Sequence, residues 1–145
     1  VNPDAVALTR RNAIAAQVGA LRLEQGDIAD PTLLADLDGT VDIVVSNPPY
    51  IPPDAEPTEP EVRDHDPATA LYGGGTDGLA LPRLVLIAAA RLLRPGGVVV
   101  MEHAEVQDAA VRAIASDLGF IEVTSRSDLS GRPRMVIGRR PAGEL

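Results

Sequence analysis

Four consecutive residues, Asn47-Pro48-Pro49-Tyr50, place a carboxamide and an aromatic ring on a stretch of chain with little freedom. They directly follow the apolar run 41–46, which has the composition of a β-strand. Neither proline can donate a ladder hydrogen bond and both fix φ, so the strand is predicted to end here. Open α/β sheets bind their ligands at the carboxyl ends of strands. A carboxamide and an aromatic ring held at such a site suit a planar group that carries hydrogens on nitrogen. The motif therefore indicates chemistry on a planar nitrogen.

The rest of the chain alternates helical and strand patterns, which predicts an α/β domain with a largely parallel sheet. A capped helix is predicted to begin at Asn2-Pro3-Asp4 and to run to about Val18, and the strand at 41–46 has the continuous apolar character of a strand buried on both faces. The other predicted elements are strands at 21–24, 98–102, 120–125 and 134–139, helices at 31–37, 79–93 and 107–118, a helix terminator at 94–97 and an irregular loop at 51–78.

The last two predicted strands are expected to pair antiparallel. Only about ten residues separate them, and a parallel crossover needs roughly a dozen or more residues, usually including a helix.

Composition excludes several classes of function. The 145 residues form one domain at most, and the absence of cysteine excludes disulfides, thiolate metal sites and cysteine nucleophiles. His65 and His103 have no metal-ligand spacing, so no metal site is predicted. The net charge of −8 argues against a broad phosphate-binding surface. No long apolar stretch or signal peptide is found, so a cytoplasmic location without membrane contact is the default expectation.

The pattern resembles the class I S-adenosylmethionine-dependent methyltransferases, whose Rossmann-like sheet is mostly parallel and ends in an antiparallel hairpin. Within that superfamily the Asn47–Tyr50 motif is similar to that of amino-group and amide methylases. The flanking segments resemble the HemK/PrmC-type N5-glutamine methyltransferases, which modify the glutamine of the Gly-Gly-Gln loop of peptide-chain release factors. These segments are Ile51-Pro52, residues 60–67, residues 70–74, Asp77-Gly78-Leu79, and Glu102-His103 with Gln107.

The resemblance implies roles for particular residues. The Asn47 side-chain carbonyl and the Pro48 backbone carbonyl would accept the hydrogens of the substrate amide. Pro49 and Tyr50 complete the substrate site, with the Tyr50 ring packed on the planar amide. Asp27, Ile28 and Asn47 would contact the cofactor, S-adenosylmethionine. The protein partner would be a release factor, with no requirement for the ribosome and no sequence-specific nucleic-acid contact.

The same resemblance implies that residues 1–145 form part of a catalytic domain. The family's first two strands, its glycine-rich cofactor loop and the acidic residue after its second strand would precede residue 1. In the family's strand order, 3-2-1-4-5-7-6, residues 41–46 would then be an exposed edge. We therefore expect weak cofactor binding and little activity from these residues alone.

Several residues have a second interpretation. Asp27 is also an ordinary turn residue, Tyr50 could belong to the core, Glu102 could orient the motif or form an ion pair, and Gln107 could cap a helix. Two other functions stay open: an amino methyltransferase acting on N6 of adenine or N2 of guanine, and an inactive, truncated binding module. The acidic composition and the absence of lysine disfavour the nucleic-acid substrate.

Overall fold

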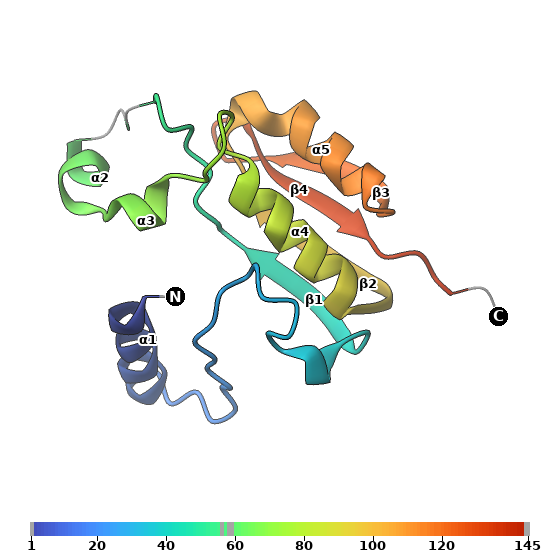
Figure 1. Cartoon of the computed structure of the whole chain (residues 1–145), viewed down its shortest axis with the longest axis horizontal. Coiled ribbons are helices and arrows are strands. Elements are labelled where there is room, and N and C mark those ends of the chain that lie inside the picture. Colours follow the sequence, from blue (N-terminus) through green and yellow to red (C-terminus); the bar gives the residue numbers. More distant parts are fainter. Residues whose placement is uncertain (1, 56, 58–59, 144–145) are drawn as a thin grey trace. The chain divides into compact units, whose positions relative to one another are not determined.

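The structure is a computed structural model that describes residues 2–55, 57 and 60–143. The chain forms two compact units, residues 1–36 and residues 37–145. In chain order the elements are α1 (Pro3–Ala15), the 3-10 turn η1 (Ala35–Leu37), β1 (Val41–Ser46), α2 (Pro60–His65), α3 (Ala68–Leu71), α4 (Ala80–Leu92), β2 (Leu93–Glu102), the 3-10 turn η2 (Glu105–Gln107), α5 (Asp108–Asp117), β3 (Ile121–Ser127) and β4 (Pro133–Arg139) (Figure 1).

The smaller unit begins with α1, as predicted. The Asn2 side chain accepts a hydrogen bond from the backbone N–H of Asp4 at 2.9 Å, and Pro3 occupies the first helical position. The helix ends at Ala15 and not near Val18, because Gln17 has a φ of 56°, which no α-helix accommodates.

Two further predictions in this unit are wrong. Residues 21–24 form no strand, because no strand lies beside them to supply ladder hydrogen bonds within the described part of the unit. The helix predicted at 31–37 is reduced to turns and η1, because Leu34 has a φ of 59°. The segment is held instead by Arg22, whose guanidinium pairs with Glu24 at 2.7 Å and with Asp36 at 2.5 Å.

The larger unit is built on a sheet with the strand order β1-β2-β4-β3. β1 pairs parallel to β2, and β4 runs antiparallel to both β2 and β3. The last two strands therefore form the predicted antiparallel hairpin. The observed order corresponds to 4-5-7-6 of the expected methyltransferase sheet, and three of the four strands run in one direction. Among the described strands, β1 has a neighbour on one side only, as expected for an edge.

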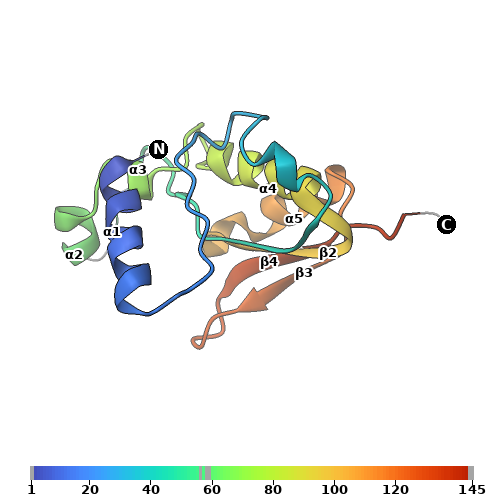
Figure 2. The same ribbon diagram turned by 90° about the horizontal axis from the view of Figure 1, so that it is seen from below.

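One face of this sheet carries the core. Helices α4 and α5 both pack on it, as Figure 2 shows with the helices on one side of the strands. Val99, Met101 and Val136 point to that side and are fully buried. On the opposite face Val45 is 74% exposed, so the prediction that β1 is buried on both faces is wrong. The reason is that both helices of the unit that pack on the sheet lie on one side.

Several elements of the larger unit differ in extent from the predictions. β2 begins at Leu93 because residues 94–97 extend the strand: Gly96 has a φ of 77° and its N–H donates to the carbonyl of Arg140. α5 begins at Asp108, since Gln107 ends η2. The segment 51–78 is not wholly irregular, because α2 and α3 lie within it. Within the described residues, no helix has the length and apolar character needed to cross a membrane.

The exposed face of the sheet gives a first prediction. Val45→Lys should change the free energy of unfolding by less than about 0.5 kcal/mol and should lower self-association, because it places a charge on an exposed apolar strand. Met101→Ala, on the buried face of the adjacent strand, should cost about 2–5 kcal/mol. Denaturant unfolding and light scattering measure both effects. Equal destabilisation by the two substitutions would contradict the one-sided core.

Candidate functional site

The Asn47–Tyr50 motif forms the floor of a pocket at the carboxyl edge of the sheet. β1 ends at Ser46, and the parallel strand β2 ends beside it at Glu102. The pocket has a volume of about 250 Å³. Its lining residues come from the motif and from the segment around α2 and α3; they are Asn47, Pro48, Pro49, Tyr50, Ile51, Val62, Asp66, Ala70 and Leu71. All four predicted substrate-site residues are therefore brought together.

Asn47 has the features of a binding group. Its side chain is exposed at the pocket, whereas Pro48 directly after it is buried. Within the described residues its carboxamide makes no hydrogen bond, so it does not act as a turn or cap residue. An amide oxygen in this state is available to accept a hydrogen from a bound molecule.

Tyr50 is held at its hydroxyl. The phenol donates a hydrogen bond of 3.0 Å to Oε1 of Glu102, the last residue of β2. Partial burial of the ring raises the pKa of Tyr50, and the Glu102 carboxylate raises it further. Of the two interpretations of Glu102, the geometry supports orientation of the motif, because Glu102 forms no ion pair among the described residues.

The main chain of the motif is held by Gln107, which is 5% exposed. Its Nε2 donates to the carbonyls of Tyr50 and Asp77, both at 2.8 Å, and its Oε1 accepts the N–H of Ala104 at 3.0 Å. Gln107 also ends η2, so the prediction of a helix-start residue holds, but its tertiary contacts were not predicted. The residue after the motif, Ile51, exchanges backbone hydrogen bonds with the segment 71–73.

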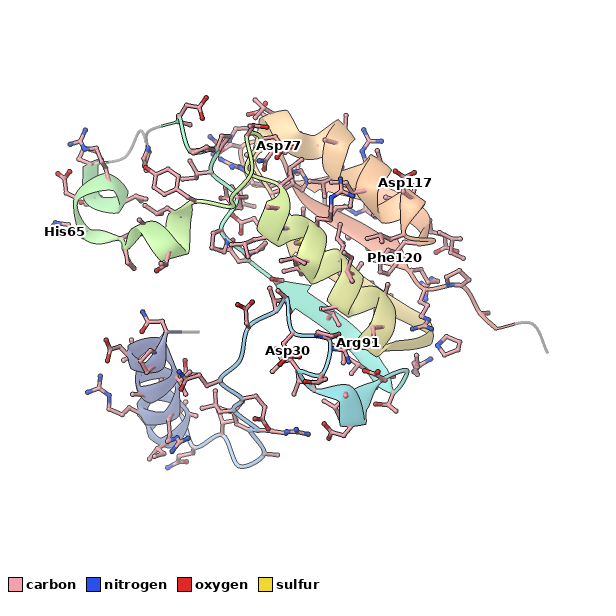
Figure 3. The ribbon with its side chains drawn as sticks, in the orientation of Figure 1. Asp30, His65, Asp77, Arg91, Asp117 and Phe120 are labelled. Atoms are coloured by element: carbon pink, nitrogen blue, oxygen red, sulfur yellow. The ribbon has the colours of Figure 1, made fainter. Side chains whose placement is uncertain are left out.

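Two glycines allow the segment 73–78 to approach the motif. A side chain at Gly73 would meet the carbonyls of Gly78 and Pro49, and one at Gly78 would meet the carbonyl of Tyr50. Figure 3 shows Asp77 in this segment, immediately before α4. The Asp77 carboxylate accepts the N–H of Leu79 at 3.0 Å near the start of that helix. Gly73, the first of three consecutive glycines, is buried and tightly packed.

The other predicted cofactor residues, Asp27 and Ile28, lie in the smaller unit. The Asp27 side chain is exposed, and its Oδ1 accepts the N–H of Ala29 at 2.9 Å, which forms an Asx turn. Within the described residues its second oxygen accepts no hydrogen bond. Ile28 is half-buried beside it. The turn interpretation of Asp27 is therefore correct, and one carboxylate oxygen stays available for a ligand.

The histidines lie apart from this pocket's lining. His103 is fully buried, with Nδ1 2.8 Å from the Ala104 carbonyl and Nε2 3.8 Å from the Asp108 carboxylate. His65 is exposed at the end of α2 (Figure 3). In the part of the chain that the structure describes, no three histidine, aspartate or glutamate side chains gather as a metal site requires.

Sequence reasoning missed the far wall of the pocket. Val62, Asp66, Ala70 and Leu71 line it from a segment that was predicted to be an irregular loop. A signal was present, because Pro60 suits a first helical position and Val62 and Asp66 are spaced four residues apart.

Comparison with known proteins confirms the predicted resemblance. Several relatives named release factor glutamine methyltransferase are 39–49% identical to this chain. The one from Mycolicibacterium smegmatis is 49% identical over 142 residues, covering 97% of this chain and 49% of that protein. A relative from Streptomyces pristinaespiralis, named 4-amino-L-phenylalanine/4-methylamino-L-phenylalanine methyltransferase, is 48% identical over 93 residues, 64% of this chain and 31% of that protein. No family model matches the chain.

The fold comparison agrees. A solved methyltransferase from Pyrococcus furiosus superposes with a TM-score of 0.67 at 20% identity, over 97% of this chain and 60% of that one. The chain therefore has the Rossmann-like methyltransferase fold, and it spans about half the length of the curated relatives that it matches over most of its residues.

Tyr50 gives a prediction that can be tested by titration. In a Tyr72→Phe background, Tyr50 is the only phenol, and its pKa should lie above the ordinary value of about 10. Glu102→Gln should move this pKa down toward the ordinary value, because it removes the adjacent negative charge. Phenolate absorbance against pH measures it.

The sign of the linked stability change follows from the raised pKa. The folded unit holds the phenolic proton more tightly, so this contribution is complete below about pH 10 and is lost as the pH rises through the raised pKa of Tyr50. An unchanged pKa in the Glu102→Gln variant would contradict the orienting role of Glu102.

The close packing of Gly78 against the motif gives another prediction. Gly74 and Gly78 have the same φ of 75°, but only Gly78 faces the backbone of the motif. Both substitutions by alanine carry the same conformational cost, so Gly78→Ala should lower the free energy of unfolding by about 1–3 kcal/mol more than Gly74→Ala. Denaturant melts of the two variants measure the difference. Equal melts would show that the close approach contributes nothing.

Proposed function

We propose that this chain forms the methyl-acceptor side of an S-adenosylmethionine-dependent methyltransferase whose substrate is the glutamine in the Gly-Gly-Gln loop of peptide-chain release factors. The observation that carries the proposal is the Asn47 carboxamide, which makes no hydrogen bond among the described residues and lies at a pocket lined by two prolines. The relatives named release factor glutamine methyltransferase supply the substrate class. The release factor is then the protein partner, and the cytoplasm is the compartment where the two would meet.

In the proposed reaction the chain must orient a weak nucleophile, the nitrogen of the glutamine side-chain amide. The lone pair of an amide nitrogen is delocalised into its carbonyl, so position and electrostatics must supply the rate. The Asn47 side-chain oxygen and the Pro48 backbone carbonyl are the two acceptors for the NH2 hydrogens. Accepting both hydrogens orients the nitrogen and stabilises the positive charge that develops on it. The ring of Tyr50, held by Glu102, packs against the amide and excludes water.

S-adenosylmethionine would supply an electrophilic methyl group on a sulfonium. Each unit by itself carries residues suited to a part of that molecule. In the smaller unit one oxygen of Asp27, beside the half-buried Ile28, accepts no hydrogen bond from the described residues, which suits the amino edge of an adenine. In the larger unit Asn47 lines the pocket, and its carboxamide makes no hydrogen bond among the described residues, which supports a contact with the cofactor as well as with the substrate. After transfer the methylated nitrogen loses its proton, so the chain needs no general base before that step.

A second candidate acceptor is an aromatic amine. The relative from Streptomyces pristinaespiralis bears the name of a 4-amino-L-phenylalanine methyltransferase and matches this chain at 48% identity. An amine on a ring presents the same planar NH2 to two acceptors. The shorter coverage, 64% of this chain against 97% for the release factor enzyme of Mycolicibacterium smegmatis, favours the glutamine substrate. A nucleic-acid amine is disfavoured because the pocket lining contains Asp66 and no arginine.

A chimera tests the proposal at full length. In it, this chain replaces the matching half of the Mycolicibacterium smegmatis relative. With methyl-labelled S-adenosylmethionine, label should enter a release factor and should be absent when the loop glutamine is changed to alanine. RNA and 4-amino-L-phenylalanine, offered separately, test the other acceptors. Label in either of these and none in the release factor would overturn the proposed substrate.

Asn47→Ala in the chimera gives the residue-level prediction. Removing one aimed acceptor should lower kcat by about 10²–10³. The melting temperature should change little, because the exposed carboxamide makes no hydrogen bond within the described residues. Methyl transfer and thermal unfolding are measured on the same preparations. Turnover equal to that of the parent chimera would remove Asn47 from the mechanism.

A further inference from the structure

Gln107 joins three segments that are distant in the sequence. Its side chain is almost fully buried, and it makes three hydrogen bonds, all to backbone groups. The two N–H groups of Nε2 reach the carbonyl of Tyr50 in the motif and the carbonyl of Asp77 in the glycine-rich segment. The oxygen receives the N–H of Ala104, directly beyond β2. A glutamine is suited to this place because it alone among long uncharged side chains offers two donors and an acceptor.

The bond to Tyr50 matters because the motif has few other attachments. Its two prolines donate no hydrogen bonds, and the Asn47 carboxamide makes none with the residues that the structure describes. Tyr50 is fixed at its hydroxyl by Glu102 and at its carbonyl by Gln107. Glu102 is the last residue of β2 and Gln107 ends the turn η2 that follows it. The same short stretch of chain therefore holds both the hydroxyl and the carbonyl of Tyr50.

The position of Tyr50 is transmitted to the acceptors through the prolines. Pro48 and Pro49 have fixed φ angles, so the backbone between the Pro48 carbonyl and Tyr50 has few torsions left to absorb a displacement. A shift at the Tyr50 carbonyl therefore changes the direction of the Pro48 carbonyl and of the Asn47 side chain. The glycine-rich segment moves with it, because Gly78 lies against the same carbonyl and Gln107 holds Asp77.

We propose that Gln107 is a positioning residue for the methyl-acceptor site: its carboxamide sets the orientation of the Asn47 and Pro48 acceptors through the main chain of Tyr50. The proposal rests on the proposed function. It assigns no contact with substrate to Gln107, which acts through the motif. Loss of its donors should therefore lower the rate of transfer and leave the affinity for substrate and cofactor nearly unchanged.

Two substitutions in the chimera isolate the donors. Gln107→Glu keeps the oxygen that accepts from Ala104 and replaces the donors with a second oxygen facing two carbonyls. Gln107→Met keeps the length and removes every hydrogen bond without adding charge. Val106→Glu is the matched control, since it adds the same charge one residue away on a side chain that is 89% exposed.

Steady-state kinetics should show a specific pattern. A displacement of about 1 Å can cost on the order of 10²-fold, so kcat should fall by about that factor in both Gln107 variants. The KM values for release factor and for S-adenosylmethionine should stay within about threefold of the parent. Val106→Glu should match the parent. Rates are divided by the folded fraction from circular dichroism at the assay temperature.

A second measurement does not depend on activity. In the 145-residue chain with Tyr72→Phe, Gln107→Met should lower the pKa of Tyr50 toward its ordinary value, because the ring is no longer held beside Glu102. If the parent chimera fails to methylate, the proposed function is wrong and this titration still decides whether Gln107 holds the motif. The inference is overturned if kcat per folded molecule stays within about threefold, if the loss lies in KM, if the Tyr50 pKa is unchanged, or if both variants fail to fold.

Discussion

The loop that follows β1 contains two consecutive prolines, and these residues have no backbone N–H groups with which to hold the loop. The rest of the site depends on this lack of donors. Pro48 and Pro49 cannot donate hydrogen bonds, so the carbonyls around them need donors from elsewhere. The donors come from Gln107 at one point and from the segment 71–73 at another. Among the described residues the Asn47 carboxamide makes no hydrogen bond, although the loop that carries it is held by these contacts.

The sheet order explains why this support is available. β1 and β2 are parallel neighbours, so the loop after β1 and the residues after β2 emerge side by side at one edge. Glu102 reaches the Tyr50 hydroxyl from the end of β2, and Gln107 reaches its carbonyl from the next turn. The glycines at 73 and 78 then allow a third segment to pack on the same loop. The position of the motif is thus determined by several segments that meet at this edge.

Local patterns in the sequence were sufficient for the elements that local forces decide. The strand end before the motif, α4, the hairpin of β3 and β4 and the cap at Asn2 were predicted correctly, because proline chemistry, helical periodicity and short connections act over a few residues. The strand predicted at 21–24 failed because a strand needs a partner, and pairing is non-local. The burial of β1 was overestimated for a similar reason: its apolar composition does not say which faces are covered.

Within the candidate site the sequence pointed only to the motif, whose role stays a prediction, and, apart from Glu102, not to the residues that hold it. The residue types of the motif indicated acceptors for a planar nitrogen, but nothing near Gln107 in the sequence marks it as a partner of Tyr50, which is 57 residues away. The far wall of the pocket was hidden by the many prolines and acidic residues of 51–78, which resemble a loop. Long-range hydrogen bonds and close glycine contacts depend on the assembled fold.

The pairing of arginines with carboxylates affects which kind of molecule can bind at the carboxyl edge of the sheet. Among the described residues at least eight arginines form ion pairs with carboxylates, as Arg63 does with Asp64 and Arg91 with Asp38. Their positive charge is already compensated, and the pocket itself contains an aspartate and no cation. A phosphate chain would meet repulsion here and would gain little from counterion release. A neutral amide meets no such penalty, since its hydrogens need only acceptor oxygens. The electrostatics of the edge and the geometry of the motif are therefore both consistent with the proposed substrate, whose reacting group is an uncharged NH2.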